Sequence, residues 1–158
     1  MTSEPPEPTH DRAAEASRSD RDRTLHAIHR LETSLETAAG AETWLPDVAT
    51  DLAALEAAMH DERNEMARPD ALLAMIHAEH PRRFGPRIRN LYHQYDDIMR
   101  QVASLRAQLT ERREGEPDAA DLRQRCGWLT TALRHCRALQ TDLVYEAVEL
   151  DLGEPPTD

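Results

Sequence analysis

The chain has 158 residues, which is enough for one domain with a single hydrophobic core. It carries 19 basic and 30 acidic residues, so its formal net charge is −11, and it contains no lysine. This acidic balance argues against nucleic acid as a partner, because phosphate groups are bound by a basic face. Aromatic residues make up 4%, which disfavours a β-sandwich or barrel, whereas the abundance of Ala, Leu, Glu, Arg and Gln favours helices.

The ends of the chain and its cysteines bear on organisation and location. We expect a disordered N-terminal tail over 1–19, one helical domain over 20–152 and a C-terminal tail over 153–158. No apolar run approaches the roughly 18–20 residues that cross a bilayer, and the first residues do not resemble a signal peptide. Cys126 and Cys136 would lie about 15 Å apart on one helix, too far for a disulfide. These features predict a cytoplasmic protein with no membrane partner.

Four long helices and one short helix are predicted in chain order. Gly40 is expected to stop the first helix, and Thr43 to cap the second. Pro86 is expected in the first turn of the third long helix, and Asp118 to cap the fourth. The predicted ranges are 20–39, 43–68, 69–79 (the short helix), 86–113 and 118–152.

Apolar residues recur at helical spacing in each long segment and define the expected core faces. Short turns after the first and third long helices favour antiparallel neighbours. We therefore predict an all-α, up-down-up-down four-helix bundle, with the short extra helix between its second and third helices. A homodimeric coiled coil is the alternative, which the frequent Gly and Pro disfavour. The expected core faces are Leu25, Ile28, Leu31, Leu35 and Ala38; Trp44, Val48, Leu52, Leu55, Met59 and Met66; Ile88, Leu91, Tyr95, Ile98, Val102, Leu105 and Leu109; and Leu122, Leu129, Leu133, Cys136, Leu143, Ala147 and Leu150.

The histidines raise the question of a metal site. At about 100° per residue, His26 and His93 point away from the expected core. His77 and His80 have the i, i+3 spacing of a metal-binding pair, but they precede Pro81 and no partner spacing supports them. We expect each of these histidines to lie in solvent.

Three polar residues on the expected core faces are the candidates for chemistry. Glu62 lies about twenty residues from the first turn, and Tyr95 and Cys136 each lie about twenty residues from the last turn, so all three fall roughly 30 Å along the bundle in one layer. The first helix would add a fourth residue to this layer. The candidates there are Arg21, Thr24 or His26.

This layer has two interpretations. One is a polar or metal-binding pocket in the core. The other is a structural layer in which Glu62 accepts a hydrogen bond from Tyr95 and Cys136 packs as a small hydrophobe. The structural interpretation is favoured, because one carboxylate, one phenol and one thiol are a poor ligand set for zinc or a di-iron centre.

Two segments resemble a group of bacterial hemerythrin-like proteins. They are AEHPRRFGPRI at 78–88 and DLVYEAVELDLG at 142–153, and the similarity extends over about 44–153. The resemblance implies a four-helix bundle with a di-iron centre held by inward His and carboxylate ligands. It also implies that this chain has Glu62, Tyr95 and Cys136 where the group often has His, so that the iron site is altered or lost. Iron is thus a candidate cofactor, with no metal the favoured prediction.

The sequence has no Gly-rich phosphate loop, Gly-x-Ser-x-Gly elbow or paired-carboxylate cleft, so we do not expect an enzyme. Two other functions are the main candidates. The first is a binding or sensing role for a bundle with an altered or lost di-iron site. The second is a metal-free interaction module that docks a protein partner or a second copy. Its contact surface would be the short helix or the acidic strip of Asp142, Glu146 and Glu149, although a solvated strip is favoured. Peroxide or nitric-oxide chemistry would require bound iron.

Overall fold

The computed structural model describes residues 8–37, 40, 42–111 and 119–153, and within these residues every regular element is an α-helix. The all-α class predicted from the sequence is therefore confirmed. No described helix is long and apolar enough to cross a membrane. The helices are α1 (Pro8–Glu36), α2 (Trp44–Met66), α3 (Leu72–Glu79), α4 (Pro81–Thr110) and α5 (Ala119–Gly153).

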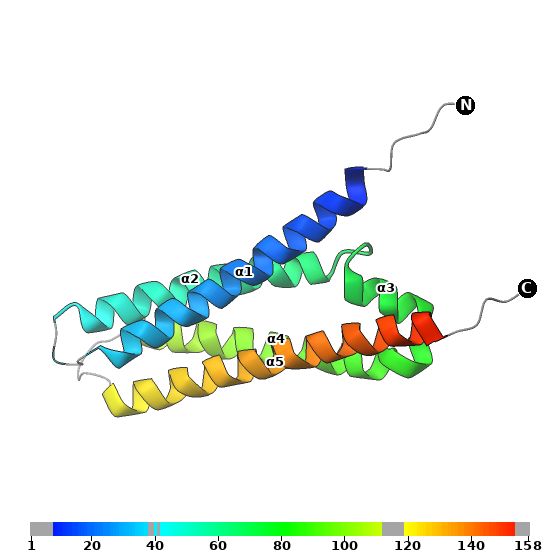
Figure 1. Ribbon diagram of the computed structural model, residues 1–158. Coiled ribbons are helices and arrows are strands. Elements are labelled where there is room, and N and C mark those ends of the chain that lie inside the picture. The colour runs from blue at the N-terminus through cyan, green and yellow to red at the C-terminus, as the bar shows by residue number, and fades with distance from the viewer. Residues whose placement is uncertain (1–7, 38–39, 41, 112–118, 154–158) are drawn as a thin grey trace, which may run out of the picture.

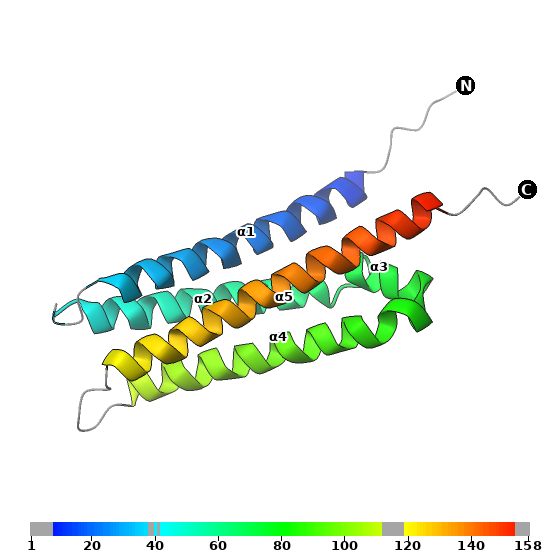
Figure 2. The same cartoon turned by 60° about the horizontal axis from the view of Figure 1, so that its bottom comes forward.

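The four long helices lie alongside one another (Figures 1 and 2). The connections from α1 to α2 and from α4 to α5 are at one end of the molecule, and α3 lies at the other end, beside the last turns of α5 (Figure 1). Packing is extensive between α1 and α2, between α2 and α4, and between α4 and α5. It is light between α1 and α5, because the N-terminal part of α1 rises away from the other helices (Figure 1).

The core faces expected for α2, α4 and α5 are buried almost entirely as predicted, with Leu109 and Leu150 partly buried at the margin. On α1, however, Leu25 is 42% exposed, and Thr24 and Ala27 are buried in its place. The expectation for Leu25 is wrong because α1 diverges from α5 there. Leu25 instead lines a cleft of about 330 Å³ between these two helices.

The first helix begins earlier than predicted: α1 starts at Pro8 and includes residues 8–19, which the sequence analysis assigned to the N-terminal tail, whereas residues 1–7 lie outside the described part. Residues 8–19 have no apolar period, but half of them are the helix formers Ala, Arg and Glu (three, two and one residue). The unfavourable free energy of helix nucleation is met once, by the packed part of α1. Each residue added to its end then contributes one backbone hydrogen bond without a further nucleation step. The expected turn over 115–117, the cap Asp118 and residues 154–158 lie outside the described residues.

The start of α4 also differs from the prediction. The helix begins at Pro81 and continues through Pro86. Proline suits the first helical position, because its missing N–H would have no partner there. Gly85 lets α3 approach this part of the helix closely, since a Cβ atom at Gly85 would lie 3.1 Å from His77 Nε2. At the start of α2, Thr43 is in the N-cap position as predicted, but its side chain makes no capping hydrogen bond.

We predict that Leu55→Ala lowers the free energy of unfolding by about 2–5 kcal/mol, because it leaves a cavity in the core. Leu55 is fully buried, whereas Leu72 on α3 is 46% exposed. The matched control Leu72→Ala should therefore change stability by only about 0.5 kcal/mol. Urea denaturation of both variants measures the difference, and equal losses would contradict this packing.

Candidate functional site

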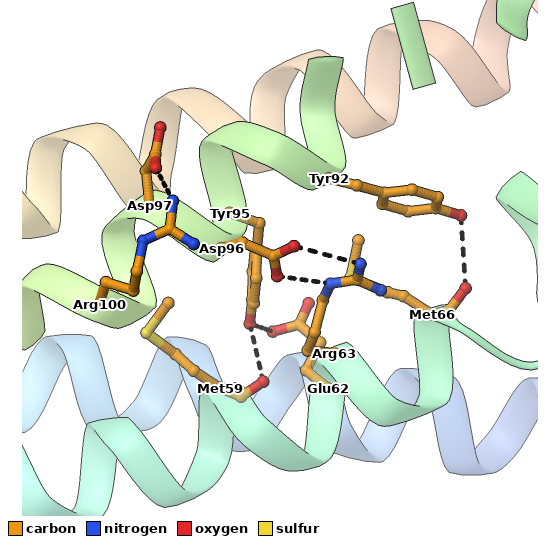
Figure 3. Close-up of polar contacts among 9 residues, drawn as sticks. All are labelled: Met59, Glu62, Arg63, Met66, Tyr92, Tyr95, Asp96, Asp97 and Arg100. Carbon is orange, nitrogen blue, oxygen red and sulfur yellow. Dashed lines mark hydrogen bonds and ion pairs between the residues drawn. The ribbon is translucent and has the colours of Figure 1, made fainter. Parts of the chain in front are cut away.

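The carboxylate of Glu62 is the central feature of the candidate site. This α2 residue is 2% exposed, so its charge is removed from water. Its Oε2 accepts a hydrogen bond of 2.9 Å from the hydroxyl of Tyr95 on α4, and the carbonyl of Met59 lies 3.4 Å from the same hydroxyl (Figure 3). Burial and the adjacent carboxylate raise the pKa of Tyr95 far above its ordinary value. The phenol therefore stays protonated and acts as a donor.

A cation from α5 faces the same carboxylate. Nη1 of Arg137 lies 3.8 Å from Oε1 of Glu62, and the Arg137 side chain is 20% exposed. Its Nη2 donates a hydrogen bond to the backbone carbonyl of Arg21 on α1. Because a buried charge is tolerated only when it is paired, Arg137 is the group that allows Glu62 to lie in the core.

The fourth helix contributes a hydroxyl group. Thr24 on α1 is 1% exposed, and its Oγ1 lies 3.1 Å from the carbonyl of Asp20 and 3.4 Å from that of Ala58 on α2. It also lies within hydrogen-bond reach of Tyr95. Each long helix thus supplies one polar side chain to a buried group that we call the polar layer. Its members are Thr24, Glu62, Tyr95 and Arg137.

The sequence analysis identified three of these four residues. Glu62 and Tyr95 meet directly, and of the three candidates on α1 the structure brings in the side chain of Thr24. Arg21 contributes its carbonyl group, and His26 is exposed to solvent. Cys136 is buried, but its thiol points toward Oε1 of Gln94 at 3.8 Å.

Sequence reasoning missed Arg137. Adjacent residues of a helix point about 100° apart, so Cys136 and Arg137 cannot both face Glu62. In the structure, α5 is rotated about its axis so that Arg137, and not Cys136, faces Glu62. One signal was present in the sequence: a carboxylate expected in the core needs a cation, and Arg137 lies at the edge of the core face of its helix.

The polar layer does not fit a di-iron centre. Such a centre needs several imidazole and carboxylate ligands, and its ligands must be deprotonated. The layer offers one carboxylate, a protonated phenol and a hydroxyl, and the guanidinium of Arg137 lies where a metal would approach Glu62. Within the described ranges, neither Glu62 nor Cys136 belongs to a group of three His, Cys, Asp or Glu ligands.

A second polar contact reinforces the α2–α4 side of the layer. Nε and Nη2 of Arg63 donate hydrogen bonds to the two carboxylate oxygens of Asp96, at 2.8 and 3.4 Å (Figure 3). The same guanidinium lies 4.7 Å from the ring centre of Tyr92 in a cation–π contact. The hydroxyl of Tyr92 in turn donates to the carbonyl of Met66 at 3.3 Å. These contacts hold the register of α2 against α4 next to Glu62 and Tyr95.

The two cysteines are free and buried. Burial raises the pKa of Cys126 to about 11 and also raises that of Cys136. Since the thiolate is the reactive form, both thiols are expected to be chemically inert in the folded chain.

One of the three residues in the acidic strip of α5, Glu146, forms an ion pair with another helix. Glu146 accepts two hydrogen bonds, of 2.7 and 2.9 Å, from the guanidinium of Arg87 on α4. The hydrogen bond to Arg87 lowers the pKa of Glu146. Asp142 and Glu149 are exposed. Glu146 therefore joins two helices, and it is less available to an external partner than the exposed Asp142 and Glu149.

Comparisons with protein-family models, with curated proteins and with solved structures found no match. The resemblance to hemerythrin-like proteins therefore depends on the two sequence segments alone and stays a prediction.

We predict energetic coupling between Glu62 and Arg137. Glu62→Gln leaves Arg137 without its counter-ion, and Arg137→Gln leaves a buried carboxylate unpaired, so each single variant should be destabilised. The double variant should lose less than the sum, with a coupling of about 1–3 kcal/mol, because its two neutral amides need no counter-ion. Urea denaturation of the four proteins measures the cycle, and additive losses would show that the pair does not interact.

Proposed function

We propose that this chain is a hemerythrin-like, up-down-up-down four-helix bundle whose di-iron centre has been replaced by the polar layer. In this proposal it acts as a protein-interaction module with no metal in its core, and it catalyses no reaction. The presence of one polar side chain from each long helix at a single depth supports the bundle arrangement. Two free cysteines are consistent with the cytoplasm, a reducing compartment, as its location.

The observation that carries the interaction role is an apolar stripe on the outside of α5. Tyr145, Val148 and Leu152 are spaced i, i+3 and i+7, so they share one face of the helix. Their exposed fractions are 64%, 51% and 83%. At about 100° per residue this face lies opposite the buried residues Leu143 and Ala147. The C-terminal half of α5 is therefore apolar on two opposite faces, and only one of them is covered by the core.

The charges around this outer stripe favour a basic partner. Helical phase places Asp142 and Glu149 along one side of the stripe and Asp151 along the other, and all three are exposed. A second copy of the chain would bring the same carboxylates and a further net charge of −11 to the contact. We therefore assign as partner an amphipathic helix with an apolar face bordered by Arg or Lys, which binds by apolar packing and charge complementarity.

The partner class can be tested with synthetic helical peptides. The full chain should bind an amphipathic peptide of Leu and Arg, and Tyr145→Ser with Val148→Ser should weaken binding by about tenfold or more, because two large apolar side chains are lost. The matched control Leu25→Ser removes an exposed apolar residue elsewhere and should leave the affinity unchanged. Fluorescence anisotropy gives the dissociation constants. Equal affinity of the double variant and the control would eliminate the α5 surface.

Metal analysis tests the core and also decides the altered-iron alternative. Protein purified after expression with excess iron should contain no iron whose binding depends on Glu62, because Arg137 already neutralises this carboxylate. The same iron content is expected for Glu62→Gln. One or two iron atoms per chain that disappear in Glu62→Gln would overturn the metal-free core and support the altered di-iron site.

A further inference from the structure

A second group of metal-ligating side chains lies outside the polar layer, at the end of the molecule where α3, α4 and α5 meet. Glu79 is the last residue of α3, His80 joins α3 to α4, and Asp151 is in the last turn of α5. One ligand atom from each lies within 4.8 Å of the other two. Among the described residues, this is the one group of three such side chains that come so close.

The geometry points to a binding site for a divalent transition-metal ion, with Zn²⁺ as the representative ion, formed by Glu79, His80 and Asp151. This site is separate from the polar layer and does not depend on the proposed function. One imidazole and two carboxylates are a ligand set that zinc accepts, with the fourth position left to water.

The spacing of the ligand atoms supports this assignment. Nε2 of His80 lies 3.5 Å from Oδ1 of Asp151. Two ligands at about 2.1 Å from a tetrahedral zinc ion lie about 3.4 Å apart. The imidazole and the Asp151 carboxylate therefore have nearly the separation that zinc requires. Glu79 is exposed at the end of its helix, so its side chain can rotate to complete the set.

The surrounding structure orients the imidazole. The His80 ring packs edge-on against Phe84, with ring centroids 5.9 Å apart, and Phe84 is fully buried. The carbonyl of His80 accepts the backbone N–H of Phe84 at 3.0 Å, which fixes the backbone at the start of α4. The ring is thus held from one side, while Nε2 faces the carboxylate of Asp151.

The local electrostatics favour a cation. Glu79 and Asp151 lie in the last turns of α3 and α5, where unpaired backbone carbonyls carry partial negative charge. The N-terminus of α4 begins next to His80 and opposes this effect in part. In the described part of the chain, neither Glu79 nor Asp151 has an arginine at ion-pair distance, and the guanidinium of Arg83 lies over the Phe84 ring at 5.6 Å. The two carboxylates therefore keep their capacity to bind a metal.

The site corrects one expectation from the sequence. His77 and His80 were expected in solvent, but both are half-buried at the junction of α3 and α4. His77 packs against Gly85, and His80 turns toward α5. The partner of His80 is therefore a carboxylate 71 residues away in sequence, which no local spacing indicates.

Calorimetric titration of the full chain with Zn²⁺ tests the proposal. We expect one site whose affinity falls by about tenfold or more in His80→Gln and in Asp151→Asn, because each removes a ligand. The matched controls His135→Gln and Glu149→Gln alter exposed residues of α5 outside the group and should bind as the unmodified chain does. Binding that is unchanged in His80→Gln, or lost equally in His135→Gln, would overturn the site.

Thermal unfolding gives an independent readout. Zn²⁺ should raise the Tm of the unmodified chain, and this shift should disappear in Asp151→Asn, because an ion bound only to the folded state stabilises it. Glu62→Gln should keep the shift, since the polar layer is not involved. A shift lost in Glu62→Gln but kept in Asp151→Asn would place the metal in the core, which would overturn both the surface site and the metal-free core. Absence of any shift would overturn the surface site alone.

Discussion

The buried charge of Glu62 is the constraint that the surrounding structure satisfies. A carboxylate with 2% exposure has lost its hydration and is tolerated only if other groups replace the water. Two groups do so, the hydroxyl of Tyr95 and the guanidinium of Arg137, and the hydroxyl of Thr24 lies within hydrogen-bond reach of Tyr95. Since these side chains come from three other helices, the relative height and rotation of all four long helices are fixed at this layer.

Because the chain contains no lysine, the ion pairs between its helices are made by arginine or histidine. Between α4 and α5 the cation is Arg87, which pairs with Glu146, and between α5 and α1 it is Arg134, which pairs with Glu32. A guanidinium donates several hydrogen bonds in a plane, so it can bind a carboxylate in two places or reach a backbone carbonyl. Arg123 illustrates this versatility, because it donates to two carbonyls at the end of α1 while it lies over the ring of Trp44.

α5 connects the different features of the molecule. Its inner face completes the core, its edge supplies Arg137 to the polar layer, its outer face carries the apolar stripe, and its last turn brings Asp151 to His80. If the outer stripe is the docking surface, a partner would bind to the same helix that neutralises the core carboxylate. The interaction surface and the proposed metal site would then be neighbours at the C-terminal end of α5.

The sequence by itself determined the helical class and most of the core, because an apolar period of 3.6 residues is a local property. It therefore predicted the core faces of α2, α4 and α5, and, with counts from the turns, the shared height of Glu62 and Tyr95. The tertiary structure decided the rest: that Arg137 rather than Cys136 faces Glu62, that Leu25 is exposed, and that His80 meets Asp151. These outcomes depend on how each helix is rotated and where its neighbour diverges, and such long-range geometry is set by the packing of all helices together rather than by the spacing within one.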